Sequence, residues 1–369
     1  MKRYKFVPGM PGVTLFSAVC DMDNLIRAHK NASSNKGWYR EVKMVNKDPE
    51  KYLKKIQESL LNKTYHTSPY EIFERRENDK VRKIYKLPYY PDRIVQWALL
   101  QVIAPIIENT FTIDTYSSIP YRGPLICMKK LYDAVHTDFY DTMYCLKVDI
   151  HHFYPSINHN ILKDKYTRLF KDRDILWLIY EIIDSVGEDE GIPIGNYLSQ
   201  YSGNFYLTAF DHWIKEGMHV RHYYRYMDDM VFLSSDKDFL HNLLIEIVKY
   251  LDNEKLKLKG NYQIFNTDDR GIDFVGYVVH RDHVLIRKRI RDHYRSATIK
   301  YLDTDITDRH LSSYSSYTGF LQHANTYNLQ SKYGKPIIDN WGLDNDIKTN
   351  IKIQKKKRID DVCMILLMK

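Results

Sequence analysis

The chain of 369 residues is 44% hydrophobic, enough to supply the cores of two or three packed subdomains, which excludes a disordered tail. Lys and Arg outnumber Asp and Glu by 55 to 47, and the resulting pI near 8.9 favours an anionic partner without identifying it. The four cysteines show no CxxC spacing, so we expect neither a zinc site nor a disulfide framework, as in a reducing compartment. With no signal peptide or spanning apolar stretch recognised, the protein is expected to be soluble and cytoplasmic, without a membrane partner.

The first third of the chain predicts two helices separated by a charged, extended segment. In "DPEKYLKKIQESLL", residues 48–61, apolar residues recur at helical spacing. Residues 70–91 carry many charges and an extended pattern. The segment "DRIVQWALLQVIAPIIENTF", residues 92–111, then indicates a long apolar helix with Asp92 as its N-cap.

The middle of the chain combines strands that carry acids with amphipathic helices. "MYCLKVDIHHFYPSI", residues 143–157, predicts a strand that ends at Asp149, and "HVRHYYRYMDDMVFLSS" predicts a hairpin with Asp228 and Asp229 at its tip. Further helices are expected at the places where apolar residues follow a 3.6-residue period, namely residues 174–186 and 238–256. Residues 272–288 predict a pair of strands that meet at a turn, and the remainder is basic and helical. We therefore expect an α+β core with a helical appendage.

The three acids have the chemistry of a metal site for phosphoryl transfer. Adjacent carboxylates within an apolar hairpin repel each other unless a cation compensates, and Mg²⁺ prefers hard oxygen ligands of this kind. If the strand that ends at Asp149 pairs with the hairpin, the acids converge at one sheet edge and can hold two metal ions. Phosphoryl transfer needs mainly this positioning and charge neutralisation. The alternative is that Asp228 and Asp229 form a solvated turn.

Together these segments resemble reverse transcriptases. "YMDD" at 226–229 resembles the catalytic box, "LKVDIHHFYPSI" the palm strand with the other metal ligand, and the similarity covers roughly residues 75–330. The resemblance implies a right-hand polymerase fold with fingers, a palm of antiparallel sheet and helices, and a helical thumb. The expected domains are an N-terminal extension at 1–70, fingers at 71–145, palm at 146–285 with a fingers–palm turn at 191–205, and thumb and basic tail at 286–369.

The resemblance also implies roles for single residues. Asp149, Asp228 and Asp229 become ligands of two Mg²⁺ ions, or of Mn²⁺, with the Ile150 carbonyl as a further ligand. Tyr154 takes the place of the aromatic gate that excludes a ribose 2′ hydroxyl, and a fixed ring is a steric means to do so. Its alternative is a core tyrosine at a strand end.

Cations of the expected fingers strands are predicted to clamp the triphosphate of the incoming dNTP. Arg82 is the first candidate because guanidinium binds phosphate in a bidentate manner, with Lys80 and Lys83 beside it. A charged, solvated strand edge is the alternative for these residues.

The stretch "GIPIGNYLSQ" indicates the subtype. Ile194 stands where most reverse transcriptases have glutamine, followed by Gly195 and the pair Ser199 and Gln200, as in diversity-generating retroelements. Such enzymes copy template RNA into cDNA with errors opposite adenines, which implies mutagenic retrohoming and a basic accessory protein as a partner. A retron, intron-like or phage-defence reverse transcriptase is the alternative within the class, and a catalytically idle RNA-binding scaffold the alternative outside it. For Ile194 itself, core packing remains an alternative.

Overall fold

The computed structural model describes residues 3–77, 80–302 and 308–334. The described residues form two compact units, one within residues 1–130 and 137–266 and the other within residues 131–136 and 267–369. Both combine helices with antiparallel strands, which confirms the expected α+β class. The stretch expected to be an N-terminal extension lies in the same unit as the central sheet.

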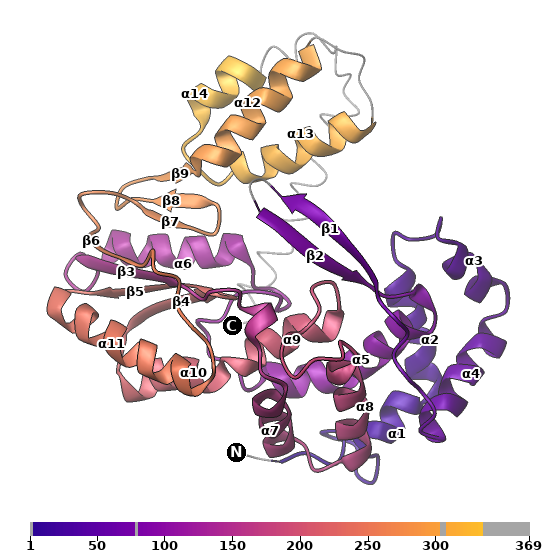
Figure 1. Ribbon diagram of the computed structural model, residues 1–369. Helices are drawn as coiled ribbons and strands as arrows, with labels where there is room; N and C mark the ends of the chain where they lie inside the picture. Colours follow the sequence, from indigo (N-terminus) through magenta and orange to yellow (C-terminus); the bar gives the residue numbers. More distant parts are fainter. Residues whose placement is uncertain (1–2, 78–79, 303–307, 335–369) are drawn as a thin grey trace. The chain divides into compact units, whose positions relative to one another are not determined.

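The N-terminal part of the first unit is helical (Figure 1). Its helices are α1 (Leu15–Cys20), α2 (Met22–Ser33), α3 (Arg40–Lys47), α4 (Pro49–Leu61) and α5 (Ile94–Glu108). Helix α4 confirms the expected helix at 48–61, and its N-cap Asp48 accepts a hydrogen bond from the Lys51 amide. Helix α5 is apolar on most sides because it packs against both α1 and α2.

The predicted capping role of Asp92 is wrong. The residue lies in a π-helical turn, η1 (Tyr89–Arg93), ahead of α5, and its side chain is fully buried. Its Oδ1 accepts hydrogen bonds from the Tyr65 hydroxyl at 2.9 Å and the Ser68 amide at 3.0 Å. A buried carboxylate needs such donors, and the segment after α4 supplies them in place of the first turn of α5.

A four-stranded antiparallel sheet forms the centre of the first unit. Its order is β4 (His222–Tyr226), β5 (Asp229–Ser234), β3 (Tyr144–Asp149) and β6 (Gln263–Asn266). Helix α11 (Lys237–Asn253) packs against β3 and β5 (Figure 1). The further helices of this unit are α7 (His159–Leu169), α8 (Arg173–Asp184), α9 (Tyr197–Tyr206) and α10 (Thr208–His212), with the short turns η2 (Tyr154–Ser156) and η3 (Trp213–Gly217). The expected strand and acid-bearing hairpin are therefore present.

A separate hairpin, β1 (Glu71–Glu77) and β2 (Lys80–Lys86), lies between α4 and η1 in the chain. It accounts for the charged, extended segment expected there. Helix α6 (Pro124–Thr137) contributes residues to both compact units.

The second unit contains a small sheet followed by helices. Its strands are β7 (Ile272–Phe274), β8 (Tyr277–Val279) and β9 (Val284–Ile286), so the prediction of two strands was wrong by one. The extra turn occurs at Val275 and Gly276, whose φ angles of 45° and 92° reverse the chain. The helices are α12 (Lys288–Leu302), α13 (Asp308–Leu321) and α14 (Tyr327–Leu329), followed by η4 (Gln330–Gly334). The predicted basic tail lies outside the described residues.

Among the described residues, no helix combines the length and the apolar character needed to cross a membrane.

Candidate active site

The three acids predicted from the sequence lie together at one end of the central sheet. Asp149 ends β3 and is the direct partner of Asp229, the first residue of β5. Asp228 lies in the two-residue turn between β4 and β5, and its carbonyl accepts a 3.2 Å hydrogen bond from the Ile150 amide. Pairing of β3 with β5 thus brings together carboxylates that are about 80 positions apart in the sequence.

The electrostatics of this group show mutual repulsion that lysines relieve. Burial raises the pKa of Asp228, and the neighbouring Asp149 carboxylate raises it further. Lys259 forms an ion pair with Asp149, and the Lys147 ammonium lies 3.6 Å from Oδ1 of Asp229. The Lys259 amide also donates to the Asp149 carbonyl at 2.8 Å, which fixes the strand end.

This group of residues fits divalent cations. Asp149, Asp228 and Asp229 supply hard carboxylate oxygens, the donors that Mg²⁺ prefers. Lys259 places its ammonium against Oδ1 of Asp149, so a positive charge is already stabilised at this oxygen. The carboxylates would hold the ions; the additional role of the Ile150 carbonyl stays a prediction.

Tyr154 lies beside the acid hairpin, in the 3₁₀ turn η2 that follows β3. Its hydroxyl donates to Sδ of Met227 at 3.4 Å, and burial raises its pKa. Gly203 of α9 lies against this pair, because a Cβ there would be 3.3 Å from the Met227 sulfur and 3.6 Å from the Tyr154 ring. The ring is half-buried and packed on one side. The gate function of Tyr154 stays a prediction.

The stretch from Gly191 to Gln200 connects the acid region with the β1–β2 hairpin. At one end, the Ile192 amide donates to the Tyr154 carbonyl at 3.0 Å. At the other, the Tyr85 amide of β2 donates to the Ile194 carbonyl at 3.1 Å. The Ile194 side chain is half-buried, so neither core packing nor a nucleotide contact follows from burial alone.

Gly195 and the residues after it have distinct surroundings. Gly195 has φ +122°, and a Cβ on it would lie 2.7 Å from the Tyr85 carbonyl oxygen. Its lack of a side chain is therefore required by the neighbouring strand β2. Ser199 is buried in α9, whereas Gln200 is exposed. Their contacts with substrate stay predictions.

The predicted fingers cations belong to β2, where Lys83 is the direct partner of Glu74 and is exposed. The side chains of Lys80 and Arg82 lie outside the described residues. The clamp on the triphosphate therefore stays a prediction.

A second group of potential metal ligands lies at the opposite end of β4. Asp138, Asp141 and His222 place ligand atoms within 4.8 Å of one another. Arg221 pairs with both carboxylates, at 2.9 and 2.7 Å, and the hydrogen bond from His222 lowers the pKa of Asp138. Because Arg221 and His222 already contact these acids, the group forms an ion-pair cluster in this structure.

Sequence reasoning missed Lys259 and Arg225, both of which contact the acid region. Lys259 is 110 positions away from Asp149, and its pairing follows from the approach of the segment after α11 to the end of β3. Arg225 is a charge inside an apolar strand pattern, directly before "YMDD". A charge within an apolar strand pattern could have predicted a buried ion pair, because charged residues are fully buried almost only when they are paired.

Comparison with known families identifies the class. Residues 74–279, more than half of the chain, match the family described as reverse transcriptase (RNA-dependent DNA polymerase). The protein therefore belongs to the reverse transcriptase family, and the acid group lies in the matched region.

Individual relatives are distant. Protein YkfC of Escherichia coli K12 is 25% identical over 44% of this chain and 45% of its own length. The group II intron-encoded protein LtrA of Lactococcus lactis is 24% identical over 51% of this chain and 33% of its own length. The chain thus spans less than half of the length of these relatives. The telomerase of Candida albicans, solved with a fragment of telomeric RNA, matches with a TM-score of 0.46 and 12% identity over 77% of this chain and 61% of its own.

Proposed function

We propose that the protein is an RNA-directed DNA polymerase that extends a primer on template RNA with dNTPs. The observation that carries this proposal is the convergence of Asp149, Asp228 and Asp229 at the paired ends of β3 and β5. Membership of the reverse transcriptase family supports it. In the reaction, the primer 3′ oxygen forms a bond to the α-phosphorus as the bond to pyrophosphate breaks and the hydroxyl proton is released.

The protein's own part in this reaction is positioning. The antiparallel register holds Asp149 opposite Asp229, and the tight turn places Asp228 beside them. Asp149, Asp228 and Asp229 would hold divalent cations, which would supply charge neutralisation for the phosphoryl transfer. Tyr154, packed against the hairpin, limits the room beside the sugar and so favours dNTPs over rNTPs.

Primer extension on an RNA template tests the proposal. Asp228→Asn should lower the rate of dNTP addition at least about 100-fold, since even residues that merely orient metal ligands contribute about 10- to 100-fold. Asp252→Asn, an exposed acid next to the end of α11, serves as the matched control and should retain the wild-type rate. Full cDNA yield from Asp228→Asn would contradict the role of Asp228, whereas no extension by the folded wild-type protein would favour the scaffold alternative.

We further propose that the enzyme is that of a diversity-generating retroelement and makes errors opposite template adenines. The support is Ile194, which replaces a polar group that could brace the nascent base pair, in a turn bonded to the β1–β2 hairpin. Discrimination arises largely from polar groups left unpaired in the wrong complex, so an apolar residue selects less strictly. Copying of a template RNA whose cDNA carries changes at adenines, with a basic accessory protein as partner, completes this proposal.

Sequencing of cDNA made by Ile194→Gln tests the subtype. The frequency of misincorporation opposite adenine should fall by several-fold, while Ile194→Leu, which keeps an apolar side chain, should retain the wild-type spectrum. An error spectrum in Ile194→Gln equal to that of the wild type would contradict the role of Ile194. A wild-type spectrum without adenine bias would favour the retron, intron-like or phage-defence alternatives.

A further inference from the structure

A fully buried arginine lies two residues before the Met227–Asp228 turn, which carries one of the three acids. Arg225 of β4 and Asp211 of α10 both have no exposed surface. Nε of the guanidinium donates to Oδ1 of Asp211 at 2.7 Å, and Nη2 donates to Oδ2 at 2.5 Å. Removing such a pair from water is unfavourable, and bidentate geometry and further hydrogen bonds must offset this loss.

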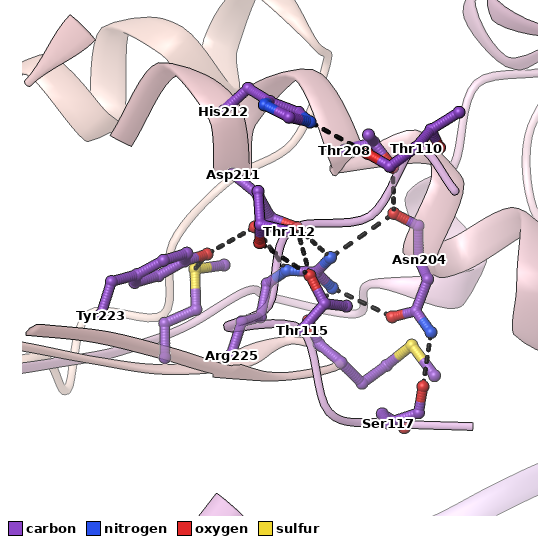
Figure 2. Close-up of polar contacts among 12 residues, drawn as sticks. Thr110, Thr112, Thr115, Ser117, Asn204, Thr208, Asp211, His212, Tyr223 and Arg225 are labelled. Carbon is purple, nitrogen blue, oxygen red and sulfur yellow. Dashed lines mark hydrogen bonds and ion pairs between the residues drawn. The ribbon is translucent and has the colours of Figure 1, made fainter. Parts of the chain in front are cut away.

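The surroundings of Asp211 complete its hydrogen bonding. The Tyr223 hydroxyl donates to Oδ1 at 2.6 Å, and the Thr115 hydroxyl donates to Oδ2 at 2.9 Å (Figure 2). Each carboxylate oxygen thus accepts two hydrogen bonds. Asp211 is thus held by Tyr223 of β4 and by Thr115, and it in turn holds the Arg225 guanidinium. The ion pair cannot shift without leaving a buried polar group unsatisfied.

The third nitrogen of the guanidinium contacts the Met227–Asp228 turn. Nη1 of Arg225 donates to the Met227 carbonyl at 3.0 Å and to Oδ1 of Asn204 at 3.1 Å. The amide of Asn204 in turn donates to the Ser117 carbonyl at 2.6 Å (Figure 2). The Met227 carbonyl belongs to the peptide group that leads into Asp228, so its orientation sets the direction in which the chain enters that acid.

The turn needs such support because Met227 has φ +59°. A non-glycine residue in this left-handed region is strained and persists only where its surroundings determine its conformation. The Met227 side chain is buried against Gly203 and Tyr154, which fixes one side of the residue. The bond from Arg225 fixes the other side at the carbonyl.

We propose that the Arg225–Asp211 pair, together with Asn204, is a positioning network that holds the Met227–Asp228 peptide so that Asp228 faces Asp149. The inference rests on the proposed polymerase function for its kinetic consequence, although not for its effect on metal affinity. Arg225 acts through the peptide and touches no reacting atom.

The double variant Arg225→Met with Asp211→Leu separates positioning from folding. Apolar side chains of similar size often replace a buried ion pair without loss of stability, so the thermal midpoint should stay within a few degrees of the wild type. The dissociation constant for Mn²⁺, from the electron paramagnetic resonance signal of the free ion, should rise about tenfold or more. The single-turnover rate of dNTP addition should fall by a similar factor.

Tyr223→Phe is the matched control, because it removes one bond to Asp211 and leaves the contact between Arg225 and Met227 intact. It should keep the Mn²⁺ affinity and the rate within about twofold. If the double variant fails to fold, Arg225→Lys takes its place: one ammonium cannot serve both Asp211 oxygens and the Met227 carbonyl, so the same losses are expected.

A folded double variant, or a folded Arg225→Lys, with wild-type Mn²⁺ affinity and rate would overturn the inference. Loss of stability without a change in Mn²⁺ affinity would overturn it as well, because it would show a purely structural role. An inactive wild type would contradict the proposed function alone, since the Mn²⁺ comparison among the variants does not depend on activity.

Discussion

At Gly195 two segments that are far apart in the chain come into close contact, which is possible because glycine has no Cβ. The Tyr85 carbonyl approaches to 2.7 Å of the place that a Cβ would occupy, and the adjoining Tyr85 amide is bonded to Ile194. Gly187 offers a comparison, because it also has a positive φ, +77°, but nothing lies within 4 Å of its Cβ position. The two glycines therefore separate the effect of backbone strain from that of a steric clash.

We predict that Gly195→Ala lowers the free energy of unfolding more than Gly187→Ala does. Gly187→Ala should cost about 1 kcal/mol, from strain at positive φ alone. Gly195→Ala adds a clash with backbone and should cost roughly 2–4 kcal/mol. Urea denaturation of both variants measures the difference, and equal losses would show that the contact with Tyr85 is unimportant.

The sequence predicted where the three acids lie, but not the contacts of several other residues. The acids Asp149, Asp228 and Asp229 were predicted to converge because each interrupts an apolar strand pattern, and the register confirms their placement. The contacts of Lys259 and Gly195 depend on how distant segments meet, which no local pattern records. Asp92 was predicted wrongly because a good N-cap residue type also satisfies buried donors elsewhere.

At the scale of elements, the N-terminal helices are joined by a buried histidine. His29 of α2 places Nδ1 2.6 Å from the Tyr89 hydroxyl of η1 and Nε2 2.8 Å from Oδ1 of Asn46 in α3. Burial lowers the pKa of His29 from its ordinary value of 6.5. The folded protein therefore keeps this ring neutral at a pH where the unfolded chain takes up a proton.

We predict that this histidine makes the fold sensitive to acid. Because the unfolded state binds the additional proton, the stability that depends on His29 is present above about pH 6.5 and decreases as the pH falls below it, by at most about 1.4 kcal/mol per pH unit. His29→Gln should reduce the slope of unfolding free energy against pH between 6.5 and 5. His241→Gln, on the exposed face of α11, is the control and should leave the slope unchanged. A slope in His29→Gln equal to that of the wild type would contradict the assignment.

Elements were easier to predict than their ends and their partners. The helix at 48–61 and the acid-bearing hairpin have strong periodicity, and both are present. The extra strand at 272–288 was missed because its turn depends on a positive φ at Val275. Valine rarely adopts a positive φ, so this residue type does not predict a turn. Its neighbour Gly276 was the available signal.

At the scale of the whole molecule, the acid group should link metal binding to stability. Carboxylates that repel one another in the folded chain gain from a cation that the unfolded chain does not bind. We predict that Mg²⁺ raises the midpoint of thermal unfolding, by an amount that corresponds to about 2.7 kcal/mol at 100 times its dissociation constant. Differential scanning fluorimetry with a Mg²⁺ titration measures this shift.

Two controls make the metal prediction specific. Asp149→Asn should lose most of the shift, whereas Asp252→Asn should keep it. KCl at equal ionic strength should produce a smaller change, because it screens charges without occupying the site. An equal shift in Asp149→Asn would place the stabilising ion elsewhere, for example at Asp138 and Asp141.

Two backbone hydrogen bonds of the turn at 191–195 can report on local separation of the segments that the turn contacts. The amide proton of Tyr85 is held by the Ile194 carbonyl, while the neighbouring Ile192 amide is held by the Tyr154 carbonyl. Solvent can exchange the first proton only when the β1–β2 hairpin separates from the turn, and the second only when the turn separates from the acid region. Hydrogen exchange at these two amides would therefore tell which of the two junctions opens first when substrate enters or leaves.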